Sequence, residues 1–259
     1  YTLTAAIAPP IEPYAPITYT IPIIFPTPPD NVSVETLILF NGSRLNQLYS
    51  NGALVFTSTE IADQLDTLSV HPQVNGTVVN LDDYPEIVSA YELWDTQIGN
   101  PMAANFVAAH IKSLIYSLGP AYPNLKYILI VGDDRVIPHR RIQDEALVSN
   151  ERTYASTIFA GNIEQSLALR YFLTDDYYAG LVPLPWRGRE LYLPQLAVGR
   201  LVETPQEITT AIDAFLAQPV AEPTSALVTG YDFLIDQATV ISNTLAAQAA
   251  GMLAITYES

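Results

Sequence analysis

No cysteine occurs among the 259 residues of this chain. Disulfide bonds, thiolate zinc sites and cysteine nucleophiles are therefore excluded from these residues. The sequence also lacks a run of about 18 uninterrupted apolar residues, which a transmembrane helix would require. The short signatures of serine hydrolases, phosphate-binding loops, dinucleotide-binding folds and zinc peptidases are absent. The sequence therefore gives no support for most of the enzyme classes that short motifs can identify.

Basic residues are scarce as well. Eleven Lys and Arg stand against 27 Asp and Glu, which gives a net charge of −16 and a pI near 4.3. Such a surface repels nucleic acid and anionic lipid. It suits secreted proteins and proteins that bind cations, and simple solubility explains it equally well. A hydrophobic content of 49% with 15% charged residues indicates a globular chain with a sizeable core.

The first 34 residues are rich in proline, which cannot donate a backbone hydrogen bond to a sheet. We therefore expect residues 1–34 to form an extended arm. Because the sequence begins at Tyr1 and not at methionine, we also expect the chain to be processed or excised from a longer one.

From residue 35 onwards, apolar runs alternate with stretches of helical periodicity. The clearest run, residues 126–131, ends at Gly132, Asp133 and Asp134, as expected for a buried parallel strand that delivers acids to the carboxyl edge of a sheet. Ligands collect at that edge in open α/β sheets. The alternation predicts a mainly parallel sheet with right-handed crossovers. Further strands are expected at 36–40, 76–80, 196–198, 225–229 and 253–256, and helices at 59–68, 102–118, 205–217 and 237–250.

Acidic side chains gather at two places near this predicted edge. Asp133 follows the strand at 126–131, and Asp175 and Asp176 lie in the segment Thr174–Tyr178. Adjacent carboxylates on loops can hold a hard cation such as Ca²⁺, which takes several oxygen ligands. The alternative is that these aspartates form turns and helix caps.

A second pair of acids, Asp232 and Asp236, follows the strand expected at 225–229. An acid there can orient a histidine or line a pocket for a basic side chain, while Asp236 is also placed to cap a helix. Of the three histidines, His110 lies on the apolar face of the helix at 102–118 and is expected in the core. His139 is near the edge, but no serine, threonine or lysine beside it forms an obvious catalytic partner.

Three sequence segments, taken in order, resemble the gingipain family of caspase-like cysteine peptidases. They are residues 127–138, residues 174–178, and residues 196–201 with the Thr204–Glu207 helix start. The resemblance spans residues 35–259 and leaves the proline-rich arm outside. It implies a caspase-like three-layer sandwich, incomplete at its carboxyl-terminal end. Residues 35–203 would form the amino-terminal subdomain, and residues 204–259 the start of the catalytic-type subdomain.

In that family a His-Gly pair and a later Cys form the catalytic dyad, and this sequence contains neither. The resemblance places Asp232 near the family's orienting acid. It places Asp236 at the aspartate that lines the specificity pocket of arginine-specific members. It also makes the segment with Asp175 and Asp176 similar to a calcium-binding region. It further implies a secreted or cell-surface location and a peptide or protein substrate, with the remaining carboxyl-terminal part or a partner chain completing the enzyme.

Three explanations remain open at this point. The chain is the amino-terminal piece of a gingipain-like endopeptidase and inert alone, or a pseudo-peptidase or interaction module with the same fold, or an α/β domain that binds a small ligand at its sheet edge. Sequence beyond Ser259 with a strand ending in His-Gly and another ending in Cys would favour the first.

Overall fold

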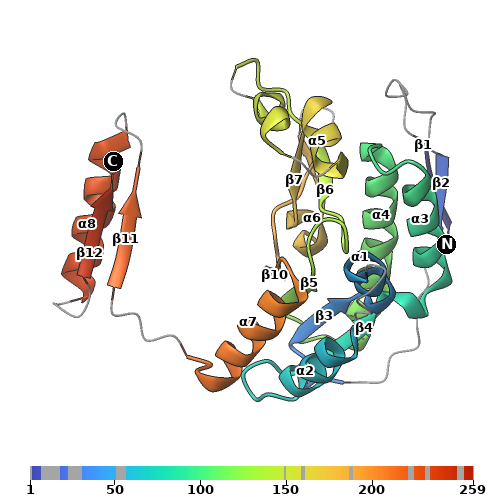
Figure 1. Ribbon diagram of the computed structural model, residues 1–259, viewed down its shortest axis with the longest axis horizontal. Helices are drawn as coiled ribbons and strands as arrows, with labels where there is room; N and C mark the ends of the chain where they lie inside the picture. Colours follow the sequence, from blue (N-terminus) through green and yellow to red (C-terminus); the bar gives the residue numbers. More distant parts are fainter. Residues whose placement is uncertain are drawn as a thin grey trace. The chain divides into compact units, whose positions relative to one another are not determined.

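The structure is a computed structural model that describes residues 2–6, 18–22, 31–50, 57–148, 150–158, 161–186, 189–220, 225–230, 234–249 and 254–258. It consists of two compact units, Tyr1–Asp213 and Ala214–Ser259. The division between the units falls inside helix α7 (Pro205–Ala217), and the boundary after residue 203 stays a prediction. Figure 1 shows the elements of each unit.

A four-stranded sheet forms the centre of the first unit. All three pairs of neighbouring strands are parallel, and β3 is buried along its whole length. The prediction of an α/β fold with a mainly parallel sheet is therefore confirmed. The strands lie in the order β10 (Ala197–Leu201), β5 (Tyr127–Val131), β3 (Thr36–Phe40) and β4 (Gly76–Asn80).

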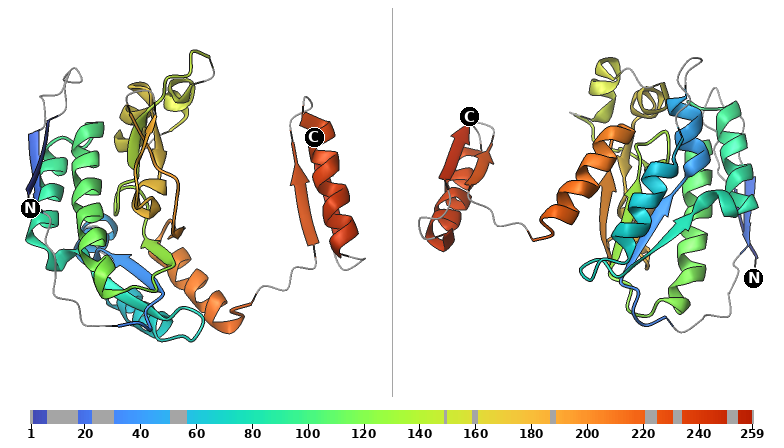
Figure 2. Two further views of the ribbon diagram at one scale, coloured as in Figure 1. Left: turned by 180° about the vertical axis from the view of Figure 1, so that it is seen from behind. Right: turned by 60° about the horizontal axis from the view of Figure 1, so that its bottom comes forward.

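The connections between these strands place helices on both faces of the sheet. Helix α2 (Thr59–Ser69) joins β3 to β4, while α3 (Pro85–Thr96) and α4 (Pro101–Leu118) lead back from β4 to β5. The two crossovers run in opposite directions across the sheet, so right-handed connections put their helices on opposite faces. Helix α7 lies beside α2 (Figure 2), and Gln64 Nε2 donates to Asp213 Oδ1 at 2.9 Å between them.

Smaller elements fill the long connection from β5 to β10. They include two antiparallel strand pairs, β6 with β7 and β8 with β9. The sequence did not predict these short elements. In chain order they are β6 (Arg140–Gln143), η3 (Glu151–Thr157), α5 (Gly161–Ala168), β7 (Tyr171–Thr174), α6 (Asp176–Ala179), β8 (Leu184–Trp186) and β9 (Arg189–Leu191).

One further helix and two 3₁₀ turns belong to the first unit. They are α1 (Gly42–Tyr49), η1 (Leu81–Asp83) and η2 (Gly119–Ala121). Within the proline-rich arm, β1 (Thr2–Ala6) and β2 (Thr18–Pro22) form an antiparallel pair. The remaining residues of the predicted arm before residue 31 lie outside the described residues.

The second unit is a strand–helix–strand element. Strands β11 (Ser225–Thr229) and β12 (Ala254–Glu258) are parallel, and α8 (Ile235–Ala249) connects them. The sequence predicted that Asp236 is the N-cap of this helix. Helix α8 begins at Ile235, so Asp236 lies in its first turn instead. The Asp236 carboxylate instead accepts a hydrogen bond from the adjacent Gln237 N at 2.9 Å.

Helix α4 is buried over most of its length. Asn100 caps it by accepting from Met102 N at 3.0 Å, and Pro101 occupies its first turn, where no backbone donor is needed. His110 is in the core, as predicted, but its Nε2 has no hydrogen-bond partner in the described part of the chain. No helix among the described residues has the length and apolar character needed to span a membrane.

Lys112 is a buried cation on α4, and within the part of the chain that the structure describes no carboxylate is bonded to its ammonium group. Its Nζ donates to Tyr178 O at 2.9 Å and to Gly180 O at 2.8 Å, and it lies 4.9 Å from the centre of the Tyr116 ring. The carbonyls belong to the end of α6, where the helix dipole favours a cation. Burial nevertheless lowers the pKa of Lys112 from 10.5 to about 8.

This lowered pKa predicts a rise of stability with pH. Between about pH 8 and about pH 10 the unfolded chain still binds the Lys112 proton while the folded chain has released it, so the free energy of unfolding should increase by up to about 2 kcal/mol. Substitution Lys112→Met should flatten this rise, as measured by urea unfolding across that pH range. Lys126, the other lysine, is exposed and paired with Glu35, so Lys126→Met should retain the rise. Equal slopes in wild type and Lys112→Met would contradict the prediction.

Candidate functional site

The loops at the carboxyl edge of the parallel sheet bond to one another. Ser43 N, after β3, donates to Asp82 Oδ2 after β4 at 2.8 Å. The buried Arg44 side chain extends from α1 to the loop after β5, where its Nε donates to Arg135 O at 2.8 Å. The Arg44 contact crosses the point between β3 and β5 at which the chain's direction of winding reverses, the usual ligand position in such sheets. In this chain, hydrogen bonds between loops occupy that position.

A tight turn follows β5. Gly132 has a φ of +103°, and a Cβ there would lie only 2.6 Å from Val136 Cβ, so glycine is required on both grounds. Asp133 stabilises the turn by accepting from Arg135 N at 2.8 Å. After this turn Asp133 is partly exposed and Asp134 is buried. Adjacent aspartates therefore have different environments.

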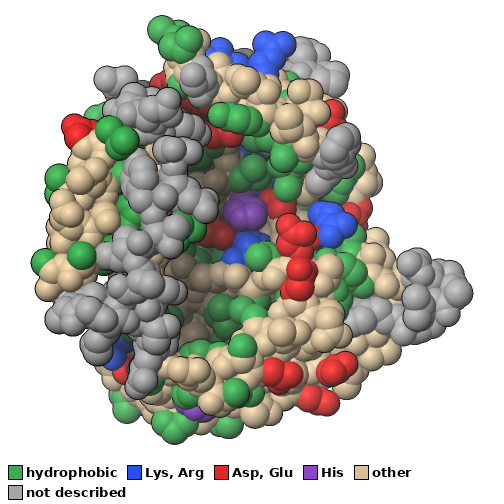
Figure 3. Space-filling model, turned by 60° about the vertical axis from the view of Figure 1, so that its left-hand side comes forward, with side chains coloured by type: hydrophobic (Ala, Val, Ile, Leu, Met, Phe, Trp, Pro, Cys, Tyr) green, Lys and Arg blue, Asp and Glu red, His purple; other side chains and the backbone are tan. Residues whose placement is uncertain are grey.

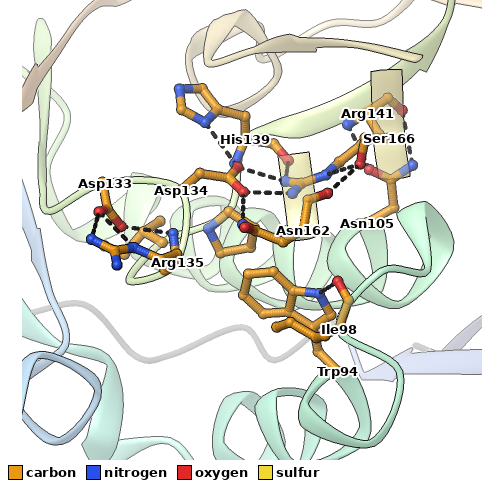
Figure 4. A network of polar contacts seen from close by, with 12 residues as sticks. Trp94, Ile98, Asn105, Asp133, Asp134, Arg135, His139, Arg141, Asn162 and Ser166 are labelled. Atoms are coloured by element: carbon orange, nitrogen blue, oxygen red, sulfur yellow. Dashed lines mark hydrogen bonds and ion pairs between the residues drawn. The ribbon is translucent and has the colours of Figure 1, made fainter. Parts of the chain in front are cut away.

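Asp134 is the centre of a buried polar network, shown in Figure 4. Its Oδ1 accepts from Arg141 Nη1 at 2.7 Å, and its Oδ2 accepts from Arg141 Nη2 at 2.6 Å. Asn162 Nδ2 also donates to Oδ2. Such a two-point pairing of guanidinium and carboxylate gives both strength and fixed geometry. Asp134 is only 2% exposed, and the Arg141 side chain is fully buried.

Arg141 makes further hydrogen bonds beyond those to Asp134. Nε donates to Ser166 Oγ at 3.3 Å, and Nη1 donates to His139 O at 2.6 Å. On the backbone, Arg141 N donates to Asn105 Oδ1 at 2.7 Å, and Asn105 Nδ2 returns a bond to Arg141 O at 2.9 Å. Helix α4, strand β6 and helix α5 are thus joined through one arginine.

The charge state of Asp134 follows from a balance of opposing effects. Burial alone would raise its pKa, but the Arg141 charge and the hydrogen bonds from His139 and Arg141 outweigh burial and hold the pKa far below its usual range. Asp134 is therefore ionised, and it belongs to a buried ion pair. Breaking one half of such a pair is costly because the other charge stays buried.

His139 links this network to a second one. Its backbone N and its Nδ1 both lie 2.9 Å from Asp134 Oδ1, while its Nε2 lies 3.5 Å from Asp175 Oδ2. Asp175 is held from the other side by Arg200, whose Nε and Nη2 donate to it at 2.9 and 2.6 Å. Figure 3 shows histidine side chains at the surface, and the one near the centre of the view has acidic and basic side chains beside it.

Arg200 also contacts the backbone that follows β5. Its Nη1 donates to Gly132 O at 2.8 Å and to Ile137 O at 2.8 Å. Burial alone would lower the pKa of Arg200, but bonding to Asp175 raises it instead. The carboxyl edge is therefore a continuous set of charge-assisted hydrogen bonds from β10 through the β5 turn to β6.

The structure places the three predicted calcium ligands as follows. Asp133 is paired with Arg135, whose Nε donates at 2.9 Å, and Asp175 is paired with Arg200. Asp176 is exposed in the first turn of α6. A cation at Asp133 or Asp175 would have to displace an arginine, so these acids as they lie do not fit a calcium site. Among the described residues no group of three or more His, Asp or Glu side chains is placed to hold a metal ion.

The two acids predicted near the specificity pocket lie in the second unit. Asp236 is exposed on α8. Asp232 lies outside the described residues. The structure therefore leaves their predicted roles as predictions.

Three members of the buried network were not predicted from the sequence as site residues: Arg141, Asn162 and Arg200. Arg200 carried a weak signal, since an arginine directly follows the apolar start of β10. Arg141 belongs to a pair of arginines that directly follows His139 near the predicted edge, which is also a weak signal. Asn162 carried none, because its contact with Asp134 depends on the placement of α5.

The buried pair predicts unequal effects at adjacent positions. Asp134→Asn should destabilise the fold by about 3–5 kcal/mol, because Arg141 would remain charged and buried. Asp133→Asn, which weakens a partly exposed pair, should change stability by less than about 1 kcal/mol. The measurement is urea unfolding at neutral pH.

The same pair predicts the pH dependence. With a lowered folded pKa, Asp134 contributes stability that is fully present above the ordinary aspartate pKa of 3.8 and declines as the pH falls below it. Asp134→Asn should therefore reduce the acid sensitivity of the unfolding midpoint. Similar losses of unfolding free energy in Asp133→Asn and Asp134→Asn would contradict the prediction that the buried pair contributes more to stability.

Comparisons with known proteins agree with the resemblance seen in the sequence. No curated protein matched the chain. A solved structure that is similar is the crystal structure of the Arg-specific cysteine proteinase gingipain R, with 15% sequence identity and a TM-score of 0.47. The match covers 90% of this chain and 43% of that one, so the chain spans less than half the length of that protein. The model of peptidase family C25 matches residues 47–231, more than half of the sequence, and the chain therefore belongs to this family, the gingipain family.

Proposed function

We infer that these residues form the supporting part of a gingipain-like cysteine endopeptidase that acts on peptides or proteins at the cell surface or outside the cell. The observation that carries this proposal is the family match over residues 47–231, a range that includes the whole network from Arg200 to Arg141. A network of charge-assisted bonds makes the sheet edge rigid, and rigid support is what a catalytic site requires.

The chemistry would be an attack of a thiolate, paired with a histidine, on a peptide carbonyl. Because the 259 residues contain no cysteine, residues outside them would have to supply the nucleophile. His139 is a poor candidate for the base, since Asp134 and Asp175 lie against its two ring nitrogens. The proposed contribution of this chain is therefore scaffold and substrate binding, with the remaining part of the same protein or a partner chain completing the site.

Asp236 is the proposed selector of the substrate. An exposed carboxylate in the first turn of α8 can form a charge-assisted pair with an Arg or Lys side chain that precedes the scissile bond. Asp232, nearby in sequence, is proposed to orient the catalytic histidine. Both roles rest on the family resemblance.

The substrate proposal predicts a change of specificity. In the protein at its natural length, Asp236→Ala should lower kcat/KM for peptides with Arg before the cleaved bond by about 100-fold, because a desolvated charge pair is lost. Peptides with an uncharged residue there should be affected far less. Asp66→Ala removes an equally exposed helical aspartate on α2 and serves as the matched control. An unchanged preference for Arg and Lys in Asp236→Ala would contradict the proposed role.

A non-catalytic interaction module is the second candidate. The placement of His139 favours it, because both ring nitrogens lie against carboxylates. Peptide cleavage by the protein at its natural length, abolished by a thiol-alkylating reagent, would identify the peptidase. Complete lack of cleavage, with the Asp134 network intact, would favour the module.

Calcium binding by Asp133, Asp175 and Asp176 stays a prediction. If these acids bind Ca²⁺, added calcium should raise the melting temperature and a chelator should lower it, because a ligand that binds only the folded state stabilises it by mass action. Asp176→Asn should then weaken the response without opening either arginine pair. A melting temperature that is the same with calcium and with chelator would contradict the site.

A further inference from the structure

The pattern Asn-Xaa-Ser/Thr, in which Xaa is not proline, occurs three times in the sequence. This pattern is the acceptor for N-linked oligosaccharides. The three tripeptides are Asn31–Ser33, Asn41–Ser43 and Asn75–Thr77. An oligosaccharide is bulky and hydrated, so a folded chain can carry one only where the asparagine faces solvent. The surroundings of each asparagine therefore decide which of the three is a usable acceptor.

Asn41 is enclosed by the fold. It is only 4% exposed, and its Oδ1 accepts from Arg44 N at 2.9 Å as the cap of helix α1. Ser43, the last residue of the tripeptide, is bonded through its backbone N to Asp82 Oδ2. An oligosaccharide on Asn41 would have to displace the start of α1 from the carboxyl edge of the sheet. The role of this asparagine is therefore that of a helix cap.

Asn75 is exposed, but its tripeptide belongs to the sheet. Its φ is +44°, and its carbonyl oxygen accepts from Glu35 N at 2.7 Å and from Thr36 N at 3.3 Å. Thr77 lies inside β4, where it pairs with Leu37 of β3. An enzyme that binds Asn75 and Thr77 together would have to separate β4 from β3. The folded chain therefore restricts access to this tripeptide.

Asn31 and the two residues after it form an exposed turn. Ser33 Oγ donates to Asn31 Oδ1 at 2.7 Å, and Ser33 N donates to the same oxygen at 3.3 Å. Within the part of the chain that the structure describes, Asn31 Nδ2 makes no hydrogen bond. The acceptor nitrogen is thus available beside the hydroxyl group that defines the pattern. No other tripeptide of this pattern has such a bond between its first and last side chains among the described residues.

Backbone hydrogen bonds hold this turn against the first unit. Asn31 N donates to Ala121 O at 3.4 Å, and Asn124 Nδ2 donates to Val32 O at 2.7 Å. These segments directly precede the strands β3 and β5, so the turn lies at the amino edge of the parallel sheet. The candidate functional site occupies the opposite, carboxyl edge. An oligosaccharide on Asn31 would therefore leave that edge open to a substrate.

We propose that Asn31 is the acceptor of an N-linked oligosaccharide and that the fold selects it over Asn41 and Asn75. The donor is an oligosaccharide joined to a polyprenyl diphosphate, and a membrane-bound oligosaccharyltransferase catalyses the transfer. In the cell this modification rests on the location outside the cell or at its surface proposed above. Peptidase activity plays no part in it.

The transfer forms one bond and breaks one. Asn31 Nδ2 gives a proton to a base of the transferase and bonds to C1 of the first sugar. The bond from C1 to the diphosphate oxygen breaks, and the polyprenyl diphosphate leaves with the electron pair. The Ser33 hydroxyl, which donates to Oδ1, favours the form of the amide that has lost this proton, because that form carries negative charge on Oδ1.

The test supplies the folded full chain with a purified oligosaccharyltransferase and a polyprenyl-diphosphate-linked oligosaccharide. Mass spectrometry of the digested product identifies each asparagine that carries sugar. We expect sugar on Asn31 alone. Three synthetic peptides, each containing one of the tripeptides without its tertiary surroundings, should all be modified. This contrast would show that the fold, and not the local sequence, excludes Asn41 and Asn75.

Four variants of the full chain sharpen the test, and circular dichroism verifies that each is folded. Asn31→Gln should abolish transfer, and Asn75→Gln, the matched control, should leave it unchanged. Ser33→Ala should lower the rate of transfer by at least about tenfold, because the hydrogen bond to the acceptor amide is lost, whereas Ser33→Thr keeps the hydroxyl and should retain transfer.

A folded chain that stays unmodified while the peptides accept sugar would overturn the proposal. Transfer to Asn75 at the rate seen for Asn31 would overturn it as well, because the fold would then make no selection. Since the enzyme and the donor are both supplied, neither result depends on whether the protein is exported or cleaves peptides. Failure of this proposal is therefore distinguishable from failure of the proposed function.

Discussion

The buried ion pair between Asp134 and Arg141 is the interaction on which the carboxyl edge of the sheet depends. A charge that is fully removed from water needs a complete set of partners, and here strand β6, helix α5 and the backbone after β5 must all be in place to supply them. The pair therefore makes the positions of these elements interdependent. It also fixes His139, through which the second ion pair, Asp175 with Arg200, is connected.

This arrangement suits a supporting role. Its acids are neutralised by arginines, and both ring nitrogens of its exposed histidine lie against carboxylates, so the edge is rigid and offers little reactive chemistry of its own. The chain belongs to the gingipain family, and its 259 residues contain no cysteine.

Sequence patterns predicted the long elements and missed the short ones. Residues 36–40, 76–80 and 127–131 are strands as expected, and the helices at 101–118 and 205–217 agree within one residue with the prediction. Helix α1 was missed because Asn41 and Gly42 have the composition of a turn; Asn41 is instead the helix cap, accepting from Arg44 N at 2.9 Å. Strands of three or four residues, such as β8, carry too little periodicity to be recognised.

The sequence by itself determined the parallel sheet, because buried strands require unbroken apolar runs, and it placed acids at the end of β5. Only the tertiary structure decided what those acids do. Asp133 and Asp134 are adjacent and chemically identical, yet the turn at Gly132 leaves one in partial contact with solvent and the other in a buried network. Asp133 pairs with Arg135, two residues further along the chain, whereas Asp134 also takes a donor from Asn162 on the distant helix α5. A carboxylate's role depends on which cations and donors the fold brings within hydrogen-bonding distance.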